Sequence, residues 1–120
     1  MTANALRVLL MLAAIALPSP TFAGETKLKG PEISAALTGH TVQGTGDDGK
    51  AWQQIFHKGG ITYYSVGGAQ SQGVWEVRGD QYCSQWPPNE SWTCYDLMTD
   101  GKTLSFVSAS GGRSSVTIQN

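Results

Sequence analysis

Short runs of alternating apolar and polar residues, separated by glycine-rich turn signals, follow one another from residue 40 to residue 119. Runs of this kind, bounded by Gly, Asp, Asn or Pro, are typical of β-strands joined by tight turns. We count eight such runs in the sequence. Their connections are shorter than the crossover of about a dozen residues that a parallel pair needs. The pattern therefore predicts an antiparallel, up-and-down meander.

Eight antiparallel strands can close into a barrel or fold into a two-sheet sandwich, and only closure removes the exposed edges. We therefore predict an all-β fold, a small calycin-like barrel, with an open sheet curled around a helix as the structural alternative. One short N-terminal helix is expected over residues 31–37, with Pro31 at its first position and Gly39 placed to end it. Ile33 and Leu37 share one face of this helix, which we expect to cover one mouth of the barrel.

The two cysteines of the chain lie on either side of a Pro-Pro turn. If the turn centres on residues 88–89, Cys83 faces Cys94 and Tyr82 faces Tyr95. Because one register satisfies the turn and both symmetric pairs, the segment predicts a two-stranded hairpin closed by a disulfide. The spacing is not Cys-x-x-Cys, so we interpret this disulfide as structural rather than redox-active.

Turn chemistry also sets the expected register elsewhere. A Gly-Gly turn is expected to place Phe56 opposite Tyr63, and an Asp-Gly turn to place Leu97 opposite Leu104. When strict two-residue turns are carried along the meander, an aromatic core that includes Tyr82 and Tyr95 falls on one face, but Val116 falls on the other face with the two cysteines. Either the last turn slips by one residue, which reverses the faces, or both faces of the sheet are partly covered.

Residues 1–23 have the order of parts of a secretory signal peptide: Arg7 precedes an apolar run, Val8–Leu17, and Ala23 offers a small residue for cleavage. The run is half the length of the ~20 residues that span a bilayer, so we expect no membrane span after cleavage. Residues 24–120 then form a single exported β domain. We expect it to be periplasmic or secreted, where a disulfide persists.

The charge pattern excludes several partners and cofactors. The net charge is −1 at pH 7, and without a basic stripe we expect no nucleic acid to bind. No glycine-rich phosphate loop is present, so no nucleotide cofactor is expected. His40 and His57 do not have the spacing of metal ligands, and we expect no metal. We expect a monomer.

Acidic residues within the expected strands are the remaining candidates for catalysis. Glu76 and Asp96 fall on the same face as the cysteines, with Arg78 nearby. This group could form a polar site around the disulfide, but we interpret it as an outward face in water, where ion pairs contribute little. We therefore predict that the protein is not an enzyme. A hydrolase that uses Asp96 or His57 is kept as a third hypothesis.

Aromatic residues are more numerous than a minimal core requires, and they are the candidates for ligand or partner contact. Trp86 and Trp92 flank the Pro-Pro turn and are the most exposed by position. Trp75 and Tyr64 are the further candidates. Aromatic side chains near a loop can bind a ligand or another protein, and they can equally pack against the prolines and stiffen the hairpin.

Over residues 32–107 the chain resembles a family of small exported bacterial proteins known only as a domain of unknown function. The shared residues are Leu37, Thr38, Gly39, Thr41, Gly44, Thr45, Phe56, Gly60, Thr62, Tyr64, Gly73, Trp75, Val77, Tyr82, Cys83, Trp86, Trp92, Cys94 and Tyr95. The Gly-x-Trp pattern is also similar to that of lipocalins. The resemblance implies the fold and the compartment and brings no catalytic residues.

Two main hypotheses of function remain. The first is a non-enzymatic periplasmic barrel domain that binds a small apolar or aromatic ligand, because a barrel of this size can hold one ligand or be filled by side chains. The second is an interaction or inhibitor module of the cell envelope, which would contact another envelope protein through the hairpin tip, Trp86–Trp92. The sequence leaves open whether the barrel interior is filled.

Overall fold

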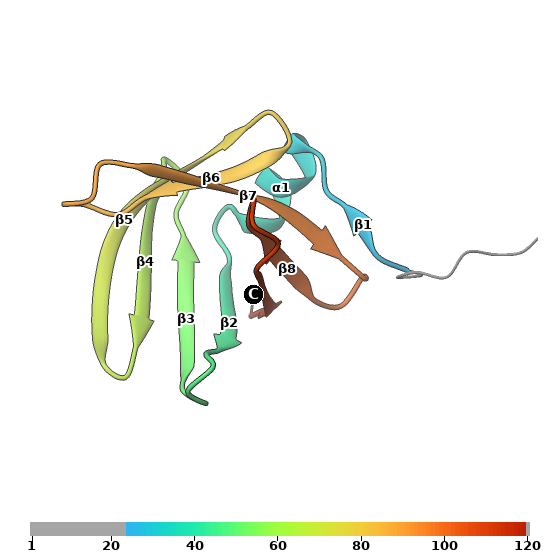
Figure 1. Ribbon diagram of the computed structural model, residues 1–120. Coiled ribbons are helices and arrows are strands. Elements are labelled where there is room, and N and C mark those ends of the chain that lie inside the picture. Colours follow the sequence, from blue (N-terminus) through green and yellow to red (C-terminus); the bar gives the residue numbers. More distant parts are fainter. Residues whose placement is uncertain (1–23, 120) are drawn as a thin grey trace, which may run out of the picture.

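A computed structural model describes residues 24–119 of the protein, which form one helix and nine strands (Figure 1). The expected signal peptide, residues 1–23, lies outside the described residues. The elements in chain order are β1 (Thr26–Lys27), α1 (Gly30–Leu37), β2 (Thr41–Thr45), β3 (Ala51–Phe56), β4 (Ile61–Val66), β5 (Ala69–Arg78), β6 (Gln81–Gln85), β7 (Trp92–Thr99), β8 (Leu104–Val107) and β9 (Arg113–Ile118).

Strands β2 to β9 form a closed, antiparallel, up-and-down barrel. Each strand pairs with the next one in the chain, and β9 pairs back with β2 from Val42↔Ile118 to Gly44↔Val116. The predicted calycin-like barrel is therefore confirmed, and the sandwich and open-sheet alternatives are wrong. Closure pairs the backbone N–H and C=O groups along the edges of β2 and β9, which would otherwise be exposed without partners.

Strand β1 is an addition that the sequence did not predict, because two polar residues carry no alternation. It pairs with β7 at Thr26↔Thr99 and Lys27↔Met98. Strand β6 pairs with β7 only as far as Tyr95. Strand β1 therefore occupies the edge of β7 that β6 has left free.

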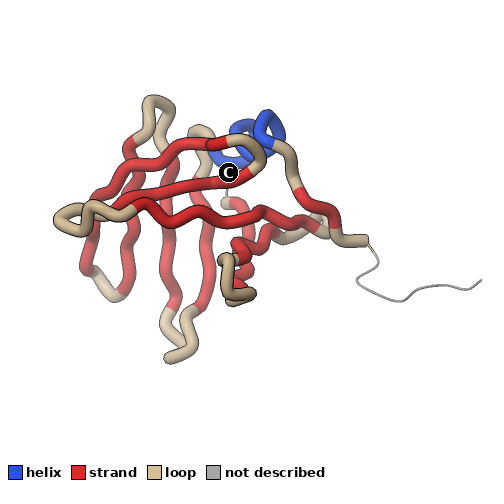
Figure 2. Tube along the Cα trace, turned by 45° about the horizontal axis from the view of Figure 1, so that its top comes forward, coloured by secondary structure: helices blue, strands red, loops and turns tan. Residues whose placement is uncertain are grey.

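The helix α1 closes one end of the barrel, as the sequence predicted (Figure 2). Ile33 and Leu37 are completely buried and belong to the same cluster as the core residues of the strands. The backbone N–H of Gly30 donates a hydrogen bond to the Asp80 carboxylate at 2.7 Å, which attaches the start of the helix to the β5–β6 turn. The helix is too short to be stable alone, so this docking is what maintains it.

Apolar side chains fill the half of the barrel next to α1. The indole Nε1 of Trp75 donates to the backbone oxygen of His57 at 3.0 Å, so the one polar atom of this large side chain is satisfied. The buried apolar residues of this cluster are Ile33, Leu37, Val42, Phe56, Trp75, Tyr82, Leu97, Leu104, Phe106 and Val116.

The disulfide hairpin of β6 and β7 has the predicted register. Cys83 faces Cys94 and Tyr82 faces Tyr95, and the two cysteines form a disulfide. The two-residue turn before β6 also places Glu76 across from Cys83. The Cys83–Cys94 and Tyr82–Tyr95 pairs therefore predicted the register of three consecutive strands, β5, β6 and β7.

The predicted register of β3 and β4 is wrong by one residue. Phe56 pairs with Thr62, not with Tyr63. The backbone N–H of His57 donates to the oxygen of Ile61 at 2.8 Å, so residues 58–60 form the loop instead of the Gly-Gly pair alone. One extra loop residue moves the partner by one position and brings Thr62, which is fully buried, to the inner face.

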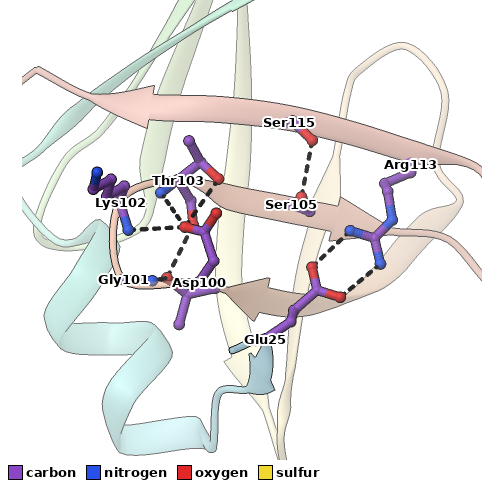
Figure 3. Close-up of polar contacts among 9 residues, drawn as sticks. Glu25, Asp100, Gly101, Lys102, Thr103, Ser105, Arg113 and Ser115 are labelled. Atoms are coloured by element: carbon purple, nitrogen blue, oxygen red, sulfur yellow. Dashed lines mark hydrogen bonds and ion pairs between the residues drawn. The ribbon is translucent and has the colours of Figure 1, made fainter. Parts of the chain in front are cut away.

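The predicted register of β7 and β8 is wrong by two residues, which keeps the faces unchanged. Leu97 pairs with Phe106, not with Leu104. The Asp100 carboxylate accepts hydrogen bonds from the backbone N–H groups of Lys102 and Thr103 at 2.8 and 2.9 Å, which builds a wider loop (Figure 3). Side-chain oxygens of Asp commonly stabilise such turns.

Both alternatives for the last turn hold in part. Leu104 pairs with Val116. This register differs by an odd number of residues from the one that a two-residue Gly-Gly turn would produce. An odd shift reverses the two faces of the strand, so Val116 enters the core. On the other face of the sheet Cys83 is also completely buried. Ile118, at the end of β9, remains 41% exposed.

Candidate functional site

The end of the barrel opposite α1 opens into a cavity of about 980 Å³. We call this the lumen site. Its lining comes from seven strands, β2 to β4 and β6 to β9, and from residues beside them, among them Asp47, Trp86 and Thr103. The inward residues used below are Trp52, Gln54, Tyr64, Tyr82, Ser84, Trp86, Tyr95 and Phe106. The half of the barrel next to the helix is filled, so the interior is open at one end only.

Three aromatic side chains form a continuous row along one wall of the lumen site. The rings of Trp52 and Tyr64 are 5.3 Å apart between centroids at an angle of 42°. The rings of Tyr64 and Trp86 are 6.3 Å apart at 75°. These tilted and edge-on geometries are the favoured ones for aromatic pairs. The row joins β3 and β4 to the end of the disulfide hairpin.

Each tryptophan of the row lies against a glycine of the neighbouring strand. A Cβ atom at Gly44 would be 2.6 Å from the ring of Trp52, and one at Gly73 would be 2.7 Å from the ring of Trp86. Since no side chain occupies these positions, both indoles pack directly on the backbone of the wall. Glycine within a strand often marks such a close approach.

The floor of the lumen site is also aromatic. Tyr82 lies 5.2 Å from Phe106 and 6.0 Å from Tyr95 between ring centroids, and Tyr95 lies 6.3 Å from Phe106. Tyr82 and Phe106 belong to the core, and Tyr95 packs against it. The floor is therefore rigidly supported from below.

A short series of hydrogen bonds joins the wall to the floor. The Nε2 atom of Gln54 donates to Thr62 Oγ1 at 3.0 Å and to Tyr82 Oη at 3.1 Å. The indole Nε1 of Trp86 donates to Ser84 Oγ at 3.1 Å. Gln54 is only 9% exposed, so this amide is a buried polar group that the fold holds in place.

The interior of the lumen site is electrically neutral. Among the described residues that line it, only Asp47 and Arg113 carry a charge. Burial raises the pKa of Tyr82 to about 12, although hydrogen bonds from Ser84 and Gln54 act in the opposite direction. The Tyr82 hydroxyl therefore keeps its proton at physiological pH.

The charge of Arg113 is already paired. Its guanidinium donates to both carboxylate oxygens of Glu25, at 2.8 and 3.2 Å (Figure 3). These hydrogen bonds raise the pKa of Arg113 and lower the pKa of the Glu25 carboxyl group. This bidentate pair fixes the side chain that carries one of the two charges of the lining.

The structure distributes the predicted contact residues over three environments. Trp86 and Tyr64 line the lumen site. Trp75 lies in the core and is 7% exposed. Trp92 is half-buried on the outer face, where the guanidinium carbon of Arg78 lies 4.3 Å from its ring centroid. Neither Trp86 nor Trp92 is the freely exposed side chain that its position beside the turn suggested.

Sequence reasoning did not select several residues of the lumen site. The signal was the alternation within β3, which places Trp52 and Gln54 on the same face as buried Phe56. Tyr82 and Tyr95 were correctly placed on the inner face but were assigned only to the core. Depth along the barrel, which separates a core residue from a lining residue, has no local signature in the sequence.

The charged residues on the cysteine face lie outside the barrel, as we interpreted them. Arg78 forms an ion pair with Glu76, and their side chains are 45% and 48% exposed. Asp96 is paired with Lys27 at 3.6 Å. Exposed pairs of this kind contribute roughly 0–1 kcal/mol. The Lys27–Asp96 pair connects β1 to β7, whereas Glu76 and Arg78 lie on the same strand, β5.

The histidines and acids of residues 24–119 include no group of three or more potential metal ligands. His57 is exposed and packs edge-on against Tyr63, with ring centroids 5.7 Å apart. The only helix in the described part of the chain is too short to cross a membrane.

The fold and the site define a small calycin-like barrel that is closed by a helix at one end and open at the other. Comparison with protein-family models, with curated proteins and with solved structures finds no match for the chain. The resemblance noted from the sequence therefore stays a prediction, and the lumen site is the feature of the molecule that bears on function.

Proposed function

We propose that the protein is a non-enzymatic, periplasmic or secreted binding domain that holds a small, neutral, aromatic ligand in the lumen site. The observation that carries this proposal is the aromatic row of Trp52, Tyr64 and Trp86. It stands in the half of the barrel that the core leaves open.

The composition of the cavity favours a flat ligand without charge. Aromatic walls offer π-faces for stacking, and the lining has no unpaired cation inside it to attract an anion. The volume of about 980 Å³ is at the upper end of the roughly 300–1,000 Å³ that is usual for small-molecule sites. The aromatic floor would remove the buried part of the ligand from water.

The proposed compartment rests on the signal-like residues 1–23 and on the disulfide. Disulfides persist in oxidising compartments and are rare in the cytosol. Cell fractionation followed by mass measurement of the isolated chain tests this point. The expected product begins near residue 24 and carries the oxidised cysteine pair, and an intact chain recovered from the cytoplasmic fraction would contradict it.

The binding proposal is tested with N-phenyl-1-naphthylamine, a neutral aromatic probe whose emission rises in an apolar site. We expect saturable binding with one probe per chain. The Trp86→Ala variant is expected to bind roughly 10-fold more weakly, because it removes one end of the row and its contact area. Native mass spectrometry of the protein purified from its own cells would then identify the natural ligand.

Trp92→Ala is the matched control, because Trp92 lies on the outer face of the same hairpin. We expect its probe affinity to equal that of the unmodified protein. Equal losses in the two variants would mean that the effect comes from the stability of the hairpin and not from the cavity. Absence of saturable binding to the unmodified protein would reject the proposed function.

The lumen site is better supported than the hairpin tip as the functional surface. The tip residues 87–91 are exposed and stand out at one side of the barrel (Figure 1). However, Trp86 contacts Ser84 and Tyr64 inside the lumen, and Arg78 covers one face of Trp92. The tip therefore lacks the free aromatic pair on which the interaction hypothesis depended.

A further inference from the structure

The Gln54 amide in the lumen site has a fixed orientation. Thr62 Oγ1 donates its own proton to the backbone oxygen of Ile55 at 2.8 Å, and a carbonyl oxygen can only accept. Thr62 Oγ1 must therefore accept the hydrogen bond that joins it to Gln54 at 3.0 Å. The amino group of Gln54 faces Thr62, and its carbonyl oxygen Oε1 faces the other way.

The Gln54 carbonyl oxygen is free to accept a hydrogen bond from a ligand. Within the described residues Oε1 has no hydrogen-bond partner, while both protons of Nε2 are used by Thr62 and Tyr82. Among the described residues, only His40 has a side-chain polar atom that is both fully buried and without a hydrogen-bond partner. Gln54 Oε1 also has no partner, so it is not fully buried and can be reached from the cavity. Gln54 lines the lumen site although the residue as a whole is 9% exposed.

The Tyr82 hydroxyl supplies a complementary donor next to this acceptor. Its oxygen accepts the hydrogen bond from Gln54 Nε2 at 3.1 Å and a further one from Ser84. Because both neighbours act as donors, the phenolic proton is left for a ligand. Because Oε1 and Nε2 share one carbon atom, the Gln54 acceptor lies close to the Tyr82 donor. Burial keeps the phenol protonated, with its pKa raised to about 12.

We propose that the lumen site recognises a flat heteroaromatic ligand whose inner edge carries a hydrogen-bond donor beside an acceptor, as in a lactam. The donor meets Gln54 Oε1 and the acceptor meets the Tyr82 hydroxyl. This inference rests on the proposed function and specifies the class of its ligand. A site built around buried polar groups discriminates against analogues that leave these groups unpaired.

The aromatic side chains hold such a ligand in the required plane. The row of Trp52, Tyr64 and Trp86 would contact its face, and the floor of Tyr82 and Phe106 would limit how deeply it enters. Stacking alone accepts any flat molecule, so the specificity comes from the polar pair at the inner edge.

Three planar bicyclic probes test the inference by quenching of tryptophan emission or by calorimetry. The compound 2-quinolone has an N–H beside a carbonyl, N-methyl-2-quinolone keeps the carbonyl but cannot donate, and naphthalene has neither group. We expect 2-quinolone to bind roughly 10- to 100-fold more tightly than N-methyl-2-quinolone, because the methylated probe leaves the Gln54 acceptor unpaired.

Two variants identify the residue responsible. Gln54→Met keeps the length of the side chain but removes both polar atoms, and we expect it to bind 2-quinolone and N-methyl-2-quinolone with nearly equal affinity, because the Tyr82 hydroxyl still meets the carbonyl of both. Thr62→Val keeps Gln54 but removes the contact that orients its amide, and we expect a reduced preference with binding retained. Thermal melts of both variants establish that they are folded, and either variant alone is sufficient for the test.

The possible outcomes separate the two proposals. If all three probes bind the unmodified protein with equal affinity, the lactam-type recognition is wrong and the aromatic binding function stands. If 2-quinolone is preferred and the preference survives in Gln54→Met, Gln54 is not the acceptor and the inference is overturned. If no probe binds, both proposals fail.

Discussion

Replacing Gly73 with alanine tests whether the wall of the lumen site is as tight as its geometry indicates. Gly73 is buried in β5. A Cβ atom there would lie 2.7 Å from the backbone oxygen of Gln85 and 2.7 Å from the ring of Trp86. The ring is held by its hydrogen bond to Ser84, and the oxygen belongs to the backbone of the β6 end. Neither group can rotate away freely.

We expect Gly73→Ala to lower the free energy of unfolding by about 1–3 kcal/mol, the usual range for overpacking. For a domain of roughly 60–100 residues each kcal/mol lowers the melting temperature by roughly 4–8 °C. A loss near the middle of that range corresponds to about 10 °C. Thermal unfolding followed by circular dichroism measures this, and a change in tryptophan emission would report the movement of Trp86.

Gly112→Ala is the control for Gly73→Ala. Gly112 lies in the exposed β8–β9 loop, and its added Cβ would meet only the hydroxyl oxygen of Ser108, at 3.2 Å. This hydroxyl is exposed and needs to move by only a few tenths of an ångström, and its hydrogen bonds to Gly112 N–H and Ser110 Oγ are themselves exposed, so we expect a change within about 0.5 kcal/mol. If Gly73→Ala melts at the same temperature as Gly112→Ala, Trp86 and β6 are not packed as described and the reasoning about the wall is refuted.

Three further predictions concern the lumen site and the hairpin. The pKa of a tyrosine phenol in an unfolded chain is near 10, whereas the pKa of Tyr82 in the barrel is raised to about 12. The stabilisation from the protonated phenol is therefore complete below pH 10, and about 2–3 kcal/mol of the free energy of unfolding is lost as the pH rises through 12. Urea titrations at pH 9 and pH 11.5 should show this loss, and the difference between the two should shrink in Tyr82→Phe. The double variant Cys83→Ala with Cys94→Ala should be less stable by about 2–4 kcal/mol in urea unfolding, and an unchanged midpoint would mean that the pairing of β6 and β7 does not depend on the disulfide. At Gly44 the three atoms nearest to an added Cβ all belong to the ring of Trp52, whereas at Gly73 one of them is a backbone oxygen. Gly44→Ala should therefore reduce binding of N-phenyl-1-naphthylamine with a smaller loss of stability than Gly73→Ala; retention of full affinity would exclude a role for the Trp52 position.

The sequence predicted the helix, the eight strands of the barrel and their order because these depend on local patterns. The symmetric pairs around the Pro-Pro turn gave the register of β6 and β7, and short connections excluded parallel pairing. Registers failed where loop length was misjudged. Lys58 joins the glycines of the β3–β4 loop, and Asp100 organises a wider β7–β8 loop through its carboxylate. Such a difference of one or two residues is not visible in an alternating pattern.

The lumen site was only partly predictable for a different reason. Alternation places Trp52, Gln54 and Phe56 on one inner face, but it does not say that Phe56 lies in the filled half and Trp52 in the open half. That distinction depends on the docking of α1 and on the stagger of the strands around the ring. Trp92 and Trp86, which looked equivalent beside the turn, are separated because they point to opposite faces of their hairpin.

The pairing of β9 with β2 has a consequence for how the chain is made. It is the one strand pair of the barrel whose partners are not consecutive in the chain, since all other neighbours are joined by short connections. During synthesis every earlier hairpin can form as it emerges, while the ring stays open until residues 113–118 are complete. A nascent or C-terminally truncated chain therefore presents two unpaired edges, on β2 and β8, that invite pairing with other chains. The last strand thus protects the chain from self-association as well as completing the wall of the cavity.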